Sequence, residues 1–233
     1  AGNSVPAGFL QKILEKQSVI PQTYLFYGPP HSGKQFLALE FFKAMNCSEN
    51  HSHEKGFYCN CCEFCNKIQQ NLSSDILFLL NRYDFEEFKK LAGYYLKNPL
   101  KPLEHKLKSE IFQFIHYLNA VYLFKKKTNE KVVDKVYEIY QKELTESSLN
   151  ELFELQTSLQ DQNDIISVEY FRQLLDKIYL SSFELKYKLL LIKDVALLNS
   201  ESSNILLKTI EEPPANLIVI MLTEHLERVL PTI

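Results

Sequence analysis

The sequence predicts an α/β fold in which a mostly parallel sheet is covered by helices on both faces. Four short apolar runs, typical of strands buried on both faces, carry this prediction. They are residues 24–27, 75–80, 187–192 and 217–222. Helical patterns separate the runs, and a glycine-containing turn followed by a lysine joins the first run to a helix. This alternation favours parallel strands with crossover helices.

Composition limits the classes of protein to which the chain can belong. It has 233 residues, of which 45% are hydrophobic and 24% charged, the balance of a soluble globular protein. That length allows one large domain or two small ones. The net charge of −3 gives no overall basic field that would attract nucleic acid. The apolar runs are too short for a membrane span, and without an export signal we expect a cytoplasmic protein with reduced thiols.

The first elements are a helix and a strand. Apolar residues recur at helical spacing within residues 5–20, at Val5, Phe9, Leu10, Ile13 and Leu14. The strand at 24–27 then leads into a loop whose Gly28, Gly33 and Lys34 have the spacing of the G-x-x-x-x-G-K-[ST] phosphate-binding motif. We therefore expect a nucleotide-binding loop, with a helix over 36–45 after it.

This loop departs from the motif in two places. In an active loop the backbone N–H groups surround phosphates, the lysine reaches the outer phosphates and the last hydroxyl binds magnesium. Gln35 has no hydroxyl, and the bulky His31 stands where a small residue would admit phosphate. The sequence predicts an NTPase scaffold with impaired or lost catalysis. The candidate nucleotide-binding residues here are Gly28, Pro29, Pro30, His31, Ser32, Gly33, Lys34 and Gln35.

The helix after the loop is expected to be largely buried. Its apolar side chains are Phe36, Leu37, Leu39, Phe41 and Phe42. A cysteine-rich module over 46–66 follows this helix.

The five cysteines form the second strong signal. Cys59, Cys62 and Cys65 make a C-x2-C-x2-C pattern, and Cys47 lies a short loop upstream. Four thiolates can close a tetrahedral shell around a structural zinc ion. Cys61 is the surplus thiol and could replace Cys62 as the ligand.

Other interpretations of the cysteine module remain open. The thiols could be free or form disulfides, although disulfides are rare in the cytoplasm. The nearby His51 and His53 compete for the position of the first ligand, but their polar surroundings favour solvated side chains.

Residues 81–163 show a different pattern and are expected to form a helical insertion. Two amphipathic faces support this expectation. The first contains Ile111, Phe114, Ile115, Leu118 and Tyr122, and the second contains Val133, Val136, Tyr137, Tyr140 and Leu144. Pro99 and Pro102 end an earlier helix near Asn98. The run Lys125 to Lys127 is interpreted as a helix C-terminus, with a phosphate-contacting patch as the alternative.

The last strands and the helix between them complete the sheet. The helix covers 200–212 and is stopped by Pro213 and Pro214. In active NTPases of this kind an acid ends the strand corresponding to 187–192 and orders magnesium. Here the next residue is Lys193, and Asp194 follows it on the opposite side of the strand. A shifted strand end could still bring Asp194 to a metal ion, which would leave residual hydrolysis.

Three segments together resemble the AAA+ clamp-loader subunits of bacterial DNA polymerase III. They are the phosphate-binding loop from Tyr24 to Lys34, the cysteine module, and the segment Asn204 to Pro214 with its continuation Leu226 to Ile233. Their order and joint presence are highly specific, and they cover 20–80 and 164–233. The segment between them has no counterpart in the family pattern.

The resemblance implies an AAA+ N-terminal module over 1–80 and 164–233, with zinc bound by Cys47, Cys59, Cys62 and Cys65. Thr223 would correspond to the sensor residue that probes the phosphate. It also implies a hetero-pentamer with gamma/tau and delta subunits, which loads a sliding clamp onto primed DNA. The lid and collar domains and the arginine-finger segment of the family would lie beyond Ile233.

Gln35, His31 and Lys193 resemble the degenerate delta-prime type, a stator, more than the ATP-hydrolysing gamma/tau type. ATP and magnesium binding are therefore doubtful, and it stays open whether the chain is an enzyme. The alternatives are an active gamma/tau-type ATPase and a zinc-stabilised adaptor unrelated to replication.

Overall fold

The structure is a computed structural model that describes residues 4–16, 20–49, 58–69, 73, 75–79, 85–122, 130–157, 168–180 and 184–231. The chain divides into two compact units. The first unit comprises residues 1–79 and 172–233, and the second comprises residues 80–171. Each unit has its own hydrophobic core.

The first unit is built on a parallel sheet. Its strands are β1 (Thr23–Tyr27), β2 (Ile76–Leu79), β3 (Lys188–Ile192) and β4 (Leu217–Thr223). They lie in the order β1-β4-β3-β2, with Leu25 opposite Met221 and Leu190 opposite Val219. All side chains of β2, β3 and β4 are buried. The predicted parallel sheet of apolar strands is therefore confirmed.

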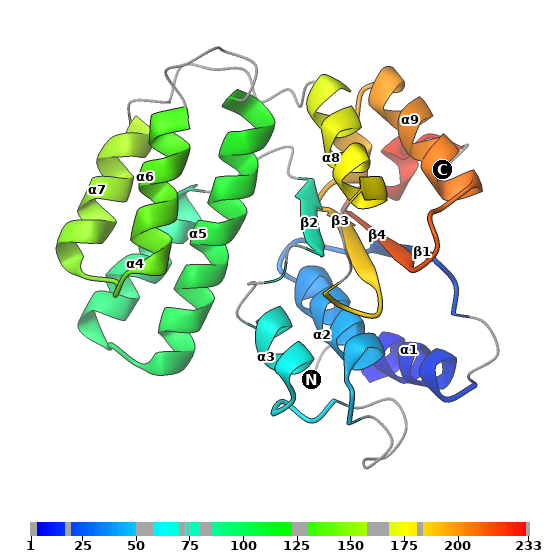
Figure 1. Ribbon diagram of the computed structural model, residues 1–233, viewed down its shortest axis with the longest axis horizontal. Helices are drawn as coiled ribbons and strands as arrows, with labels where there is room; N and C mark the ends of the chain where they lie inside the picture. Colours follow the sequence, from blue (N-terminus) through cyan, green and yellow to red (C-terminus); the bar gives the residue numbers. More distant parts are fainter. Residues whose placement is uncertain are drawn as a thin grey trace. The chain divides into compact units, whose positions relative to one another are not determined.

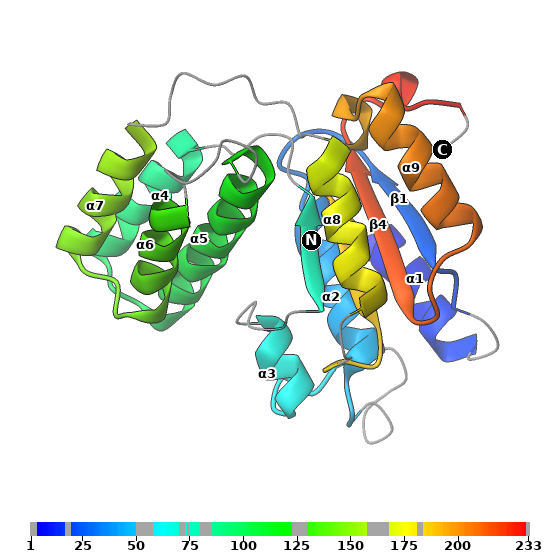
Figure 2. The same ribbon diagram turned by 45° about the horizontal axis from the view of Figure 1, so that its top comes forward.

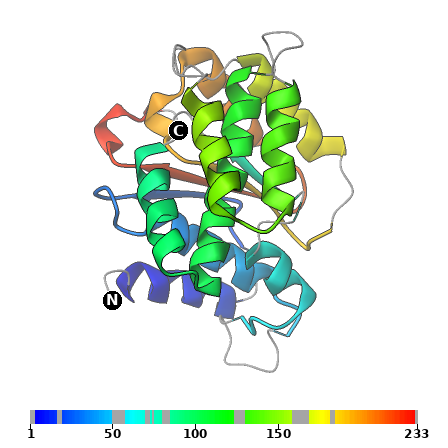
Figure 3. The same cartoon turned by 90° about the vertical axis from the view of Figure 1, so that its left-hand side faces the viewer.

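Helices cover both faces of this sheet, as Figures 1 and 2 show, with α8 and α9 on one face and α1 and α2 on the other. The same layering is visible in the turned view of Figure 3. The helices are α1 (Ser4–Lys16), α2 (Lys34–Asn46), α3 (Glu63–Gln69), α8 (Val168–Leu180) and α9 (Ser200–Glu211), with short 3-10 turns η1 (Val195–Leu197) and η2 (Leu226–Arg228). An ion pair of 3.0 Å between Arg172 and Glu201 joins α8 to α9.

Helix α2 differs in one respect from the prediction. Phe41 and Phe42 are buried as expected, but Phe36 is 68% exposed. The buried face of α2 contains Ala38, and Phe36 lies about 200° around the helix from it because the two residues are two positions apart at about 100° per residue. The prediction that Phe36 is buried was therefore wrong: hydrophobicity alone does not tell which helix face meets the sheet.

Buried polar groups fasten the amino-terminal edge of the sheet. The Oδ2 atom of Asp75, which is fully buried before β2, accepts hydrogen bonds from the backbone N–H groups of Glu184 (2.6 Å) and Leu185 (2.8 Å). At the start of β3, buried Lys188 donates from Nζ to the backbone oxygen of Ile178 on α8 at 2.9 Å. Burial lowers the pKa of Lys188, and the charge of Asp75 opposes this shift. These contacts fix the segment that leads into β3.

The second unit contains α4 (Phe85–Lys97), α5 (Lys101–Tyr122), α6 (Glu130–Gln141) and α7 (Glu146–Thr157), shown in green in Figures 1 and 3. Its core includes Ile111, Phe114, Ile115 and Leu118 from the predicted face of α5. Val136, Tyr140 and Leu144 are buried as predicted, but Tyr137 is 45% exposed. Lys125 to Lys127 lie outside the described residues, as do the side chains of Tyr122 and Val133.

Candidate functional site

The strand order places a candidate site at the carboxyl ends of β1 and β4. The chain leaves β1 for β2 at the far edge of the sheet and returns through β3 to β4, which lies beside β1. Ligands of open parallel sheets bind in the crevice at such a switch point. The loop after β1 and Thr223 at the end of β4 meet here, because the N–H of Gly28 donates to the backbone oxygen of Thr223 at 3.3 Å.

The backbone of the loop has the left-handed conformations of a tight turn. Gly28 has φ 155° and Gly33 has φ 82°, which glycine adopts without steric cost. His31 has φ 55°, a conformation that is unfavourable for a residue with a side chain. Gly33 then begins α2 without a side-chain cap. The first N–H groups of α2 face the loop end of the helix, as an anion site requires.

Lys34 turns back onto its own loop. Its Nζ donates to the backbone oxygens of Gly28 (2.8 Å) and Pro29 (2.7 Å) and lies 3.4 Å from Oγ of Ser32. In a nucleotide complex this ammonium group must reach phosphate oxygens instead. In the structure this ammonium group thus directs two short hydrogen bonds to carbonyl oxygens of its own loop.

Asp194, the acid after the end of β3, also forms hydrogen bonds. Oδ1 of Asp194 accepts a hydrogen bond from the N–H of Ala196 (3.2 Å), which caps η1, and from Oγ1 of Thr223 (3.4 Å). The Oγ1 atom of Thr223 in turn accepts from the N–H of His225 at 3.1 Å. The two candidate residues Asp194 and Thr223 are thus neighbours at the end of the sheet.

The electrostatics of Asp194 follow from its surroundings. Burial raises its pKa, whereas the hydrogen bonds from Ala196 and Thr223 lower it and the net shift is upward. The preceding Lys193 holds the strand end in place, because its N–H donates to the backbone oxygen of Leu79 at 3.0 Å. Lys193 thus follows β3 directly, and the acid Asp194 comes one position later.

The second candidate site is a cluster of thiols. The Sγ atoms of Cys47, Cys59, Cys62 and Cys65 all lie within 4.8 Å of one another, and those of Cys59 and Cys65 are 3.9 Å apart. A tetrahedral zinc ion with Zn–S bonds of about 2.3 Å needs sulfur atoms about 3.8 Å apart. The four thiols therefore fit a zinc ion closely. In the structure none of them forms a disulfide.

Backbone N–H groups prepare the thiols for a metal ion. Sγ of Cys59 accepts from the N–H groups of Cys61 (3.4 Å) and Cys62 (3.1 Å), and these hydrogen bonds lower its pKa against the effect of burial. For Cys62, burial raises the pKa, but hydrogen bonds from Ser48 and from the N–H of Cys65 outweigh it and bring the pKa to about 6. Thiolates, which are the metal-binding form, are thus favoured at Cys59 and Cys62, whereas burial raises the pKa of Cys47 and Cys65.

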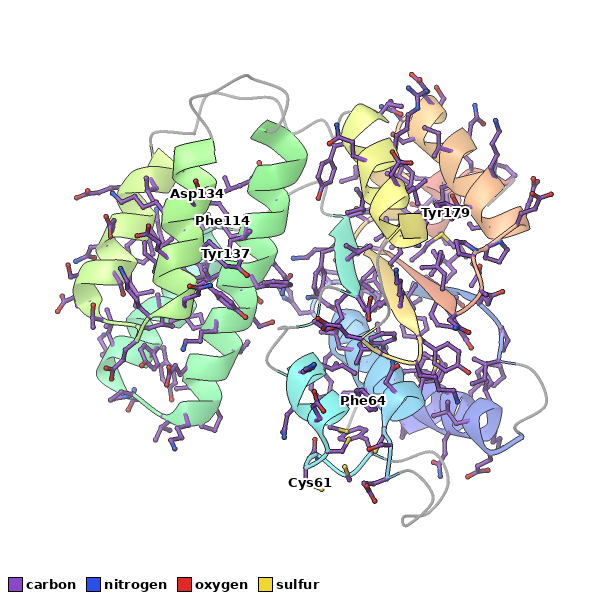
Figure 4. All side chains as sticks on the ribbon, viewed as in Figure 1. Cys61, Phe64, Phe114, Asp134, Tyr137 and Tyr179 are labelled. Carbon is purple, nitrogen blue, oxygen red and sulfur yellow. The ribbon has the colours of Figure 1, made fainter. Side chains whose placement is uncertain are left out.

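The structure also distinguishes between Cys61 and Cys62 as candidate metal ligands. Cys62 belongs to the cluster, whereas Cys61 is exposed and lies at the outer surface of the module in Figure 4. The sequence left this choice open because both residues have plausible spacings. His51 and His53 lie outside the described residues. Sequence reasoning missed Lys43, which contacts the module, because nothing in its local pattern marks a buried lysine.

A parallel sheet in this order, with a phosphate-binding loop after β1 and a cysteine module after α2, defines an AAA+ type of nucleotide-binding module. The sequence model of the family described as "DNA polymerase III, delta subunit" matches residues 4–233, so the chain belongs to this family. The resemblance seen in the sequence is thereby confirmed at the level of the family.

Two curated relatives carry the printed name "DNA polymerase III subunit gamma". They come from Buchnera aphidicola subsp. Acyrthosiphon pisum (strain APS) and subsp. Schizaphis graminum (strain Sg). Each is 41% identical to this chain over 66 residues, which is 28% of the chain and 18% of the relative. The match thus spans less than a fifth of either relative's length.

Among the helices of the described residues, none combines the length and apolar character needed to cross a membrane.

Proposed function

We propose that this chain is the N-terminal AAA+ module of a delta-prime-like clamp-loader subunit, which acts as a stator and does not hydrolyse ATP. The observation that carries the proposal is the state of the loop. Lys34 is bound to its own loop carbonyls, Gln35 offers no hydroxyl to magnesium, and Lys193 stands in place of an acid. Each of these features opposes a Mg·ATP complex, and together they oppose catalysis.

In this proposal the chain works through protein contacts in the cytoplasm. Its partners are gamma/tau and delta subunits in a hetero-pentamer, the sliding clamp and, through the assembled complex, primed DNA. ATP hydrolysis by the neighbouring motor subunits supplies the energy. The division into an AAA+ module over 1–80 and 164–233 and a helical insertion over 81–163 is part of the proposal.

Zinc is the proposed structural metal of this module. Cys47, Cys59, Cys62 and Cys65 would hold it, and their sulfur spacing supports a four-thiolate shell. Such a shell is saturated, so the metal contributes to folding and leaves no position for a substrate.

The second candidate is an active gamma/tau-type ATPase. Two observations favour it: the loop keeps Gly28, Gly33 and Lys34 at motif spacing, and both curated relatives are named as gamma subunits. In that case Asp194 would exchange its hydrogen bond with Thr223 for a role at the nucleotide.

Two measurements separate the candidates. The first is a titration of the zinc-loaded chain with Mg·ATP, together with an assay of phosphate release. The stator predicts no binding at 1 mM nucleotide, on the order of a cellular ATP concentration, and no turnover. Micromolar affinity with turnover that Lys34→Ala abolishes would establish the motor instead. The second is a pull-down of the full-length protein with candidate motor subunits, and failure to associate with any of them would remove the clamp-loader role.

A further inference from the structure

A buried lysine connects α2 to the cysteine module. Lys43 lies one helical turn before Cys47 and is only 5% exposed. Its Nζ is 2.9 Å from Oε1 of Glu40, 3.1 Å from Oδ1 of Asn60 and 3.9 Å from the centre of the Tyr58 ring. Lysine is almost never buried unless its charge is paired, so this contact set shows a specific use of the ammonium group.

Two of the three partners of Lys43 are the sequence neighbours of Cys59. Tyr58 offers the face of its ring to the cation, and Asn60 offers its amide oxygen. Asn60 has φ 57°, so the chain reverses sharply just after Cys59. Lys43 therefore contacts the side chains on both sides of this cysteine.

Cys59 is also the centre of the hydrogen bonds among the thiols. Its N–H donates to Sγ of Cys47 at 3.3 Å, and its own Sγ accepts from the N–H groups of Cys61 and Cys62. A shift of Cys59 would thus disturb the positions of the other ligands. Fixing this one residue orders most of the shell.

The positive charge of Lys43 is the second feature that connects this residue to the thiols. Four thiolates around a divalent cation leave two uncompensated negative charges, and a nearby ammonium group stabilises them, more strongly where water is excluded. Glu40 offsets part of the charge of Lys43, but its side chain is 22% exposed and is therefore partly screened by water.

We propose that Lys43 is a positioning residue of the zinc site: it fixes the segment that carries Cys59 and stabilises the negatively charged metal shell. This inference rests on the zinc proposal above. Residues that orient ligands in this way contribute about 10-fold to 100-fold to metal affinity.

The test is zinc affinity, measured by competition between the full chain and a chromophoric chelator. Lys43→Met keeps an unbranched side chain that is one heavy atom shorter and removes its charge, and we expect it to weaken zinc binding by about 10-fold to 100-fold. Lys67→Met is the matched control, because Lys67 also pairs with a glutamate in the module (Glu63, 2.9 Å) but is 34% exposed. We expect the control to stay within about twofold of the wild type. Equal affinities of wild type and Lys43→Met would overturn the proposal.

A second variant keeps the test decisive if Lys43→Met fails to fold. Asn60→Gly removes the acceptor while allowing the left-handed backbone, and Asn60 is exposed, so the fold should tolerate the change. We expect weaker zinc binding here too, and no loss in the double variant beyond that of Lys43→Met, since Lys43→Met already removes the contact with Asn60. Unchanged affinity of Asn60→Gly would refute the positioning role.

Thermal unfolding distinguishes positioning from simple stabilisation. A positioning role predicts that the difference in melting temperature between zinc-loaded and metal-free protein shrinks in Lys43→Met, because that difference reports metal affinity. A purely structural lysine would lower both temperatures equally, which would count against the proposal. A wild type that binds no zinc would instead refute the zinc site itself.

Discussion

Lys34 offers the sharpest test of the stator proposal, because the role of this lysine differs between a stator and a motor. In the structure its ammonium group makes two short hydrogen bonds to loop carbonyls, at 2.8 and 2.7 Å. Lys34→Met removes both bonds and keeps the volume of the side chain. The stator interpretation therefore predicts a loss of stability in the complete absence of nucleotide.

The expected loss of stability can be worked out from the two hydrogen bonds of Lys34. A hydrogen bond to a charged group contributes about 1.5–3 kcal/mol, and partial exposure to solvent reduces this to roughly 1 kcal/mol for each bond. Two bonds give about 2 kcal/mol, which in a chain of this size corresponds to a fall in melting temperature of about 4–8 °C.

The assay is thermal unfolding of the zinc-loaded protein followed by circular dichroism, with and without Mg·ATP. Lys208→Met, on the exposed face of α9 in the same unit, serves as the control and should change the melting temperature by less than about 1 °C. An unchanged melting temperature of nucleotide-free Lys34→Met would refute the reasoning, since the lysine would then not stabilise the empty loop. Strong protection of the wild type by ATP, lost in Lys34→Met, would support the motor.

Three further outcomes are expected. Cys65→Ser, which removes a fully buried thiol of the cluster, should abolish stoichiometric zinc in metal analysis, and a full complement of tightly bound zinc would contradict the assigned shell. Asp75→Ala leaves the buried N–H of Leu185 and the part-buried N–H of Glu184 without their acceptor and should lower the free energy of unfolding by about 2–4 kcal/mol in urea titrations; a loss below about 1 kcal/mol would show that this contact is dispensable. Burial raises the pKa of Tyr140 from 10.0 to about 12, so its neutral phenol supports the fold fully below pH 10 and loses this contribution as the pH rises through about 12. Tyr140→Phe should therefore flatten the alkaline decrease in melting temperature between pH 10 and 12, and an identical decrease in both proteins would exclude this cause.

The sequence predicted the sheet well because its strands are short apolar runs separated by helical patterns, which is typical of a parallel sheet buried on both faces. The run 187–192, for example, contains β3 (Lys188–Ile192), in which every side chain is buried. The exposure of Phe36 and Tyr137 could not be predicted, because it depends on which helix face meets the core. Apolar composition gives the type of element, and packing decides its orientation.

The two candidate sites also contain features that the sequence predicted and features that only the fold determines. Cysteine spacing predicted a metal cluster, but the choice of Cys62 over Cys61 required the fold of the loop. The contact between Asp194 and Thr223 joins residues 29 positions apart, and the bonds from Asp75 reach residues 109 and 110 positions away. Such partners are set by the order of the strands, which no local pattern encodes.

Helix α2 connects the two candidate sites and gives the stator proposal its mechanical basis. It begins at Gly33 beside the phosphate-binding loop and ends at Cys47, the first thiol of the cluster. Near that end Oδ1 of Asn46 accepts a hydrogen bond from the N–H of Tyr187 at 2.8 Å, directly before β3. A metal ion bound by Cys47 would thus fix the far end of the same helix whose near end carries the loop. A subunit that serves as a rigid surface for its neighbours needs such support even where it binds no nucleotide, so a metal site at the end of α2 away from the loop agrees with the stator proposal.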